Sequence, residues 1–150
     1  MVLADFFSVI LAVMLGVAIG VEREIRGKAA GLRTNTLICL GAAIFTIISR
    51  EMASGSEPLT RIAAQIVTGV GFLGAGAIIR DRGGISGLTT AATIWLVASI
   101  GMACGARKYL LAVISALIAI FVLVFLEKSD LLFQRYLKKN KPKDSDENSE

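Results

Sequence analysis

The chain has 150 residues, of which 55% are hydrophobic, whereas roughly 45–50% is usual for a soluble globular domain. Its mean hydropathy is +0.70, and 16 basic and 12 acidic residues leave a net charge of +4. The chain contains no histidine, which is the most common general base and metal ligand. We therefore expect neither an enzyme nor a nucleic-acid-binding protein, and we expect no cofactor.

The charged residues lie between five uncharged windows, at 6–21, 34–49, 62–79, 83–106 and 109–126. A helix rises about 1.5 Å per residue, so windows of this length approach the ~30 Å hydrocarbon core of a bilayer. A bilayer also requires that charges be confined to the connections. The sequence therefore predicts an all-α, polytopic membrane protein with about five transmembrane helices, of which the second is the weakest candidate.

Basic residues are concentrated after the first window, after the third window and in the tail. Short basic connections are retained on the cytoplasmic side of a membrane. With five spans, this bias predicts that the amino terminus lies outside and the carboxyl terminus lies in the cytoplasm. The basic residues of the two cytoplasmic connections are Arg23, Arg26, Lys28, Arg33, Arg80 and Arg82.

The pattern divides the chain into three parts. Residues 1–126 form the transmembrane domain. Residues 127–139 alternate apolar and basic side chains, which is typical of an amphipathic segment on anionic lipid, although an extension of the fifth helix explains them equally well. Residues 140–150 are polar throughout and are predicted to be a disordered tail.

Two segments of the chain are similar to each other. Aligning Gly31–Ile44 with Gly87–Ile100 makes half of the positions identical. This similarity suggests an internal duplication in which the first and second helices correspond to the third and fourth in parallel orientation. The two basic connections would then lie around one site.

The connection after the first helix is the candidate contact site. Glu22 and Arg26, like Glu24 and Lys28, are four residues apart, so modest ion pairs on a surface helix explain part of the charge. A concentration of charge directly beneath a bilayer also suits recognition of a partner. The candidate cytoplasmic contact site comprises Glu22, Arg23, Arg26, Gly31, Arg33 and Thr34.

Glycines dominate the third window. The run GVGFLG at 69–74 matches G-x-G-x-x-G, but it lies inside an uncharged span with no preceding strand, so we reject a dinucleotide site. Glycines on two faces of the helix instead predict a central helix that two neighbours pack closely.

Few polar residues lie within the spans. Gln65 and the threonines at the start of the fourth helix either bond neighbouring helices or line a path for an ion. No charged residue occupies the middle of a span, which argues against an ion-coupled carrier. The predicted helix-core motif comprises Arg61, Gln65, Gly69, Gly71, Gly74, Gly76, Thr89, Thr90 and Thr93.

Carboxylates near the connections are weak metal candidates. Mg²⁺ prefers hard oxygen ligands, and Glu22, Glu24 and Asp81 could supply them, but each has an arginine within two residues. We therefore predict no metal site. Cys39 and Cys104 lie in apolar windows and are interpreted as small core residues.

Three ordered blocks carry a family resemblance: EREIRGKAAGLRTNTLICLGAAIF at 22–45, RIAAQIVTGVGFLGAGAII at 61–79 and GLTTAATIWLVASIGMACG at 87–105. Together they resemble the membrane domain of the bacterial MgtC/SapB family. The resemblance implies a multi-pass protein of the bacterial inner membrane that is linked to growth at low magnesium and, in pathogens, to virulence. It also implies regulation of another membrane complex, with ATP synthase as one such partner.

Two departures from the family pattern stand out. Ser86 occupies a place that is often basic in the family. Many members also continue into a soluble domain, whereas this sequence has only the membrane domain and a short tail, so any function of that domain does not carry over.

Our hypothesis from the sequence is a membrane protein that supports magnesium or membrane-energy homeostasis by contacting the bilayer and another membrane protein, or a second copy of itself. One alternative is a subunit of a Mg²⁺ transporter or channel whose path is lined by Gln65 and the threonines. Another is a purely structural packing subunit.

Overall fold

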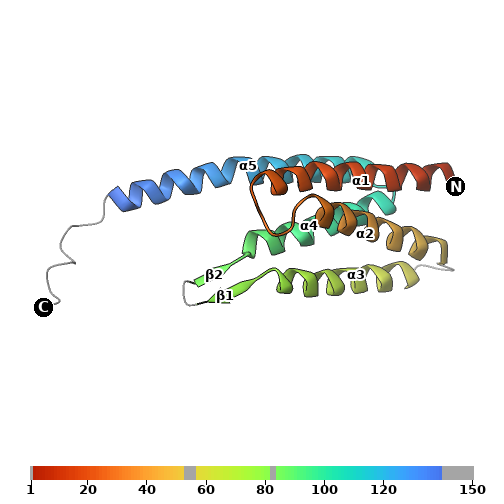
Figure 1. Cartoon of the computed structure of the whole chain (residues 1–150). Coiled ribbons are helices and arrows are strands. Elements are labelled where there is room, and N and C mark those ends of the chain that lie inside the picture. The colour runs from red at the N-terminus through yellow and green to blue at the C-terminus, as the bar shows by residue number, and fades with distance from the viewer. Residues whose placement is uncertain (1, 53–56, 82–83, 140–150) are drawn as a thin grey trace, which may run out of the picture. The chain divides into compact units, whose positions relative to one another are not determined.

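The computed structural model describes residues 2–52, 57–81 and 84–139, with side chains at 2–52, 62–80 and 84–126. Five helices and one short hairpin follow one another along the chain (Figure 1). They are α1 (Val2–Ile25), α2 (Leu32–Met52), α3 (Glu57–Gly76), β1 (Ile79–Asp81), β2 (Gly84–Ser86), α4 (Leu88–Gly105) and α5 (Tyr109–Lys139).

The predicted all-α architecture with five helices is confirmed. Four segments are long and apolar enough to cross a membrane: α1, α2, α4 and Tyr109–Leu126 of α5. The second window is the weakest candidate by sequence, but α2 meets this standard; in α3 the described side chains cover only the apolar stretch Ile62–Gly76.

Helix α2 lies between α1 and α4 because glycines bring their backbones together. A Cβ atom on Gly20 would lie 2.8 Å from the Cα atom of Leu32, and one on Gly16 would lie 2.9 Å from that of Thr36. On the other side, a Cβ atom on Gly101 would lie 2.1 Å from the carbonyl oxygen of Cys39. Only glycine permits such close approach, which is how helices gain packing contacts within a membrane.

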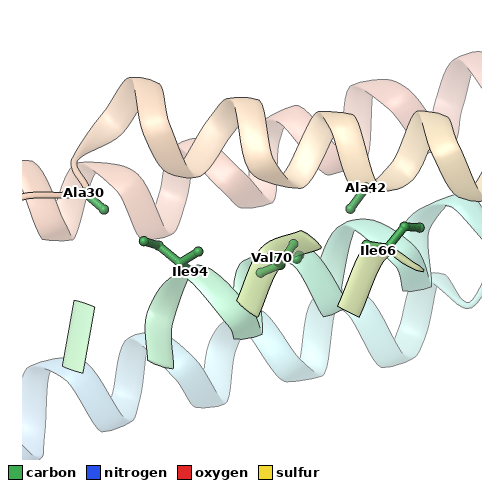
Figure 2. Close-up of a cluster of buried hydrophobic side chains, with 6 residues drawn as sticks. Ala30, Ala42, Ile66, Val70 and Ile94 are labelled. Carbon is green, nitrogen blue, oxygen red and sulfur yellow. The ribbon is translucent and has the colours of Figure 1, made fainter. Parts of the chain in front are cut away.

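Helix α3 packs on α2 and α4 through branched side chains. Figure 2 shows Ile66 and Val70 of α3 beside Ala42 of α2 and Ile94 of α4. These four residues are buried, together with Ala30 and Ala98. The shared cluster holds one side of α3 against the bundle.

Most glycines of α3 are not packed against neighbouring helices, contrary to what the sequence predicts. Ideal Cβ atoms on Gly69, Gly71 and Gly76 would meet no described atom within 4 Å, and only Gly74 faces a neighbour, with Ala91 O at 3.6 Å. The prediction of a central third helix, closely packed through glycines on two faces, is therefore wrong within the described chain. Its neighbours contact the isoleucine and valine side instead.

A hairpin replaces the expected simple connection between the third and fourth windows. Ile79 pairs with Ser86, and Arg80 pairs with Ile85, in an antiparallel ladder. Gly87 follows with φ +86°, and a Cβ atom there would lie 2.0 Å from Ala77 O. The chain can start α4 at this point only because residue 87 is glycine.

At the opposite end of the bundle, three charged side chains join α1, α2 and the α4–α5 connection. Both Arg50 and Arg107 bind the carboxylate of Asp5, and Arg50 Nη1 also donates to Gly105 O at 2.5 Å. We call this end the clasp end. The other end, which carries the 26–31 turn and the hairpin, is called the turn end.

The last helix begins at the clasp end and buries an alanine face. Ala112, Ala116 and Ala119 are at most 4% exposed, and the ring of Tyr109 packs edge-on against Phe7. Helix α5 then continues without a break to Lys139, so residues 127–139 extend the fifth helix. The tail predicted at 140–150 lies outside the described residues.

Candidate functional site at the turn end of the bundle

The turn between α1 and α2 is closed by backbone bonds. Gly27 has φ +62°, a conformation that glycine adopts without strain. Its amide donates to Glu24 O, and the amide of Lys28 donates to Arg23 O, both at 3.0 Å. The chain thus reverses directly beneath α1.

Glu24 holds the first turn of α2. Its Oε2 atom accepts a hydrogen bond of 2.9 Å from the amide of Leu32, which is the kind of group that satisfies free amides at a helix start. A Cβ atom at Gly31 would lie 1.8 Å from Oε2. Glycine at position 31 therefore makes room for the capping carboxylate.

Asn35 holds the same turn from the other side. It is fully buried, and its Nδ2 atom donates to Ala30 O at 2.7 Å and to Gly31 O at 2.8 Å. Its Oδ1 atom has no hydrogen-bond partner among the described residues. Asn35 is not among the predicted site residues, although it is the one amide in the second uncharged window.

Arg23 is not part of the exposed surface. The side chain is only 2% exposed, and Nη2 donates to Thr90 Oγ1 at 3.4 Å. Nη1 lies 3.8 Å from a carboxylate oxygen of Glu22. A guanidinium buried in this way joins α1 to α4 and cannot reach a partner protein without a change in the bundle.

Glu22 is shared between two arginines. Arg26 Nε lies 2.5 Å from Glu22 Oε1, and the Glu22 side chain is only 10% exposed. Its carboxylate therefore neutralises a basic cluster rather than standing free for a metal. Arg26 is partly exposed, at 24%, and forms the edge of this cluster.

The accessible part of the site is a recess of about 360 Å³ at the turn. Arg33 and Thr34 are exposed in its wall, and the partly buried Lys28 lies beside them. The residues that line it are Glu24, Gly27, Lys28, Ala29, Gly31, Arg33 and Thr34. The structure thus brings three of the six candidate contact residues, Gly31, Arg33 and Thr34, to one surface and places Glu22, Arg23 and Arg26 outside it.

The predicted helix-core motif is divided between the interior and the surface. Thr90 and Thr93 are buried, and Thr93 Oγ1 donates to Thr89 O at 2.8 Å, whereas the side chain of Thr89 is exposed. Gln65 is exposed on α3. The groove that holds Gln65 is lined by residues of α2 and α3 and by no threonine of α4.

Two candidate residues are not placed in detail. The side chains of Arg61 and Asp81 lie outside those that the structure describes. In the part of the chain that is described, no group of three Asp, Glu or Cys side chains converges on a common point.

Comparison with known proteins identifies the family. The model of the MgtC family matches residues 9–131. The chain belongs to the MgtC family. The match includes α2, α3, the hairpin, α4, most of α1 and the first part of α5, so the resemblance noted in three blocks extends across nearly all of the described bundle.

Relatives of this MgtC-family chain come from several bacteria. It is 53% identical to "Protein MgtC" of Brucella abortus over 95 residues, covering 63% of this chain and 40% of the relative. It is 48% identical to "Putative magnesium transporter YhiD" of Escherichia coli over 129 residues, covering 80% and 60%. It is 43% identical to "Protein MgtC" of Salmonella typhimurium over 122 residues, covering 81% and 52%.

The chain therefore spans about half the length of the curated relatives it matches. No solved structure matches it significantly. The membrane-spanning helices together with these bacterial relatives support a multi-pass protein of the bacterial inner membrane.

Proposed function

We propose that this MgtC-family chain supports magnesium and membrane-energy homeostasis by regulating another membrane complex, which it contacts through the recess at the turn end. The printed name of the Escherichia coli relative, "Putative magnesium transporter YhiD", supports the link to magnesium. In this proposal the turn end faces the cytoplasm, the amino terminus lies outside, and the chain is not an enzyme.

The recess is the observation that carries this proposal. Arg33, Lys28 and Glu24 line an open surface, and Glu24 and Asn35 hold its backbone in place by hydrogen bonds to both sides of the turn. Exposed charges on a rigid turn suit recognition of a charged partner surface. ATP synthase is the partner class that the family resemblance suggests, and its role here is part of the proposal.

A deletion strain provides the test. Cells that lack the gene are complemented with wild type or with a Lys28→Ala, Arg33→Ala double variant, and growth at low magnesium, membrane potential and ATP level are measured. We expect the double variant to lose complementation at wild-type membrane abundance. Lys108→Ala is the control, because it also removes a basic side chain, but Lys108 is exposed at the clasp end, away from the recess.

Two results would contradict this proposal. If the double variant complements fully, or if deletion changes neither growth nor membrane energy, the recess is not the contact surface that the proposal requires. Arg26→Ala is less suitable for this test, because it would also remove the nearest partner of Glu22.

The second candidate is a Mg²⁺ transporter or channel subunit, which is favoured by the printed name of the Escherichia coli relative. In one copy of the described chain, Gln65 faces outward while Thr90 and Thr93 are buried, so a path lined by all three requires an assembly. Mg²⁺ uptake into liposomes that is abolished by Gln65→Leu would favour this candidate over regulation.

A further inference from the structure

Helix α3 packs on the bundle with one side and leaves its other side exposed. It contacts α2 and α4 through Ile66 and Val70, and its opposite side is exposed, including Phe72 at 82%. The described part of its apolar stretch, Ile62–Gly76, contains one amide side chain, that of Gln65. A polar side chain on the face of a membrane helix is expected to be covered by protein, because only protein groups can satisfy its polar atoms in a bilayer.

The polar side chain on this face that needs a partner is Gln65. It lies inside the apolar stretch Ile62–Gly76 and is exposed. Its amide makes no hydrogen bond to a described residue. Thr68, which is also exposed on α3, donates to Ala64 O within its own helix at 3.0 Å. For the amide of Gln65 no such bond to a described residue is present, and an amide left unpaired in hydrocarbon costs free energy.

A groove beside Gln65 gives a second, independent observation. The space between α2 and α3 has a volume of about 660 Å³ and is lined on α2 by Gly41 and Phe45 and on α3 by Gln65 and Gly69. Ideal Cβ atoms on Gly41 and Gly69 would meet no described atom within 4 Å. The backbones of both helices are therefore open to close approach by another helix.

The spacing of exposed residues on α3 defines one stripe. At 100° per residue, Gln65, Gly69, Phe72 and Gly76 follow one another along the same side of the helix, and all four are exposed. The stripe borders the α2–α3 groove at Gln65 and Gly69.

We propose that a second copy of this chain covers the stripe and the groove, with the two α3 helices crossing at Gly69 and their Gln65 amides hydrogen-bonded to each other. The amide favours a second copy because it carries both donors and an acceptor, so it is its own complement. Copies that insert in the same orientation have parallel α3 helices, and a two-fold axis then places equal residues opposite each other.

Dimerisation of the full chain in lipid vesicles tests this inference. Subunits carrying one fluorophore each are counted by single-molecule photobleaching over a range of protein-to-lipid ratios. We expect wild type to form dimers and Gln65→Leu to dimerise about three- to twentyfold more weakly, as expected for a membrane-buried hydrogen bond. Gly69→Ile is expected to remove dimers while leaving the single copy folded, because its side chain enters open space.

Control variants separate this face from other surfaces. Ala18→Ile adds the same kind of bulk at an exposed position of α1 and is expected to leave dimers intact. For cross-linking in cell membranes, Phe72→Cys is compared with Leu117→Cys on α5, which is 63% exposed. We expect a disulfide-linked dimer from Phe72→Cys only.

Three results would overturn the inference. They are a monomeric wild type at every ratio, dimers that neither Gln65→Leu nor Gly69→Ile weakens, and cross-linking of Phe72→Cys to a different protein rather than to itself. Because the mutated residues lie away from the recess at the turn, failure of this test leaves the proposed function standing, and failure of the recess test leaves the dimer standing.

Discussion

Arg23 Nη2 donates to Thr90 Oγ1 across 3.4 Å, so a side chain at the end of α1 is bonded to the first turn of α4. The two residues are far apart in the sequence, and Arg23 is almost completely buried. By sequence, Arg23 belongs to a charged connection between helices. Through this contact its side chain is part of the helix bundle. The contact also separates the charges at the turn end into a buried set, which holds helices together, and an exposed set around the recess.

Removing the Arg23 side chain is expected to destabilise the bundle. Arg23→Met keeps length and apolar volume but leaves Thr90 and Glu22 without this partner, and we expect the free energy of unfolding to fall by about 1.5–3 kcal/mol. Unfolding in mixed micelles at increasing SDS fraction measures the change. Arg26→Met is the control, because its ion pair is partly exposed and is expected to contribute about 0–1 kcal/mol. Equal losses for the two variants would contradict the structural role of Arg23.

Glu24 is expected to stabilise α2 by capping it. Glu24→Ala removes the acceptor for the amide of Leu32 and should lower the free energy of unfolding by about 0.5–2 kcal/mol. Glu24→Gln retains a side-chain oxygen and should lose less. Hydrogen exchange of the Leu32 amide reports the cap directly. Protection that is unchanged in Glu24→Ala would show that this carboxylate does not hold the helix start.

The glycines of the bundle are expected to differ sharply in their tolerance of alanine. Gly101→Ala places a methyl group against Cys39 O and should cost about 1–3 kcal/mol through overpacking. Gly41→Ala meets open space and should leave the stability of a single copy unchanged or slightly raised, since alanine favours helix. Thermal unfolding of both variants, in detergent that keeps the chain monomeric, makes the comparison. A stable Gly101→Ala variant would contradict the close α2–α4 packing.

The Asp5 carboxylate is expected to stabilise the clasp end. Arg107 Nη2 lies 2.9 Å from Asp5 Oδ1 and 3.0 Å from Oδ2, and Asp5 is 13% exposed. Asp5→Asn leaves two guanidinium groups facing each other without a countercharge, and we expect the variant to unfold at a lower denaturant concentration than wild type. Glu51→Gln is the control, because Glu51 is an exposed acid at the same end. If both variants unfold at the same denaturant concentration, the clasp contributes no stability.

The two cysteines are expected to be protected from labelling. Cys39 and Cys104 are both fully buried, so a membrane-permeable maleimide should leave them unmodified in the folded chain and modify both after unfolding in SDS. Mass spectrometry before and after denaturation measures the number of labels. Rapid labelling of either thiol in the native chain would contradict the packing of α1, α2 and α4 around them.

The local sequence was sufficient for the parts of the fold that depend on one segment alone. Uncharged windows predicted five helices because an apolar segment leaves water whatever its neighbours are. Gly16 and Gly20 lie four residues apart, a spacing typical of a close packing seam, and a Cβ atom at either position would collide with the backbone of α2. Glycines before the second and fourth helices were also visible as a repeated pattern, and both directly precede helix starts.

The sequence did not reveal which apolar faces meet other helices and which meet the surroundings. Lipid and neighbouring helices are equally apolar, so Gly101, which is packed, and Gly69, which is exposed, have the same signature in the chain. The hairpin at 79–86 was missed because its isoleucines and glycines continue the apolar pattern of the flanking windows. These assignments needed the tertiary structure.

By itself, then, the sequence determined that the chain forms membrane helices, where they lie and to which family they belong, because hydropathy and ordered motifs are properties of single segments. Only the tertiary structure decided that Arg23 is buried against Thr90, that Arg33 and Lys28 share an exposed recess, and that Gln65 faces outward. The physical reason is that burial of a side chain depends on which helices pack against its own, and that arrangement is set by contacts between residues far apart in the chain.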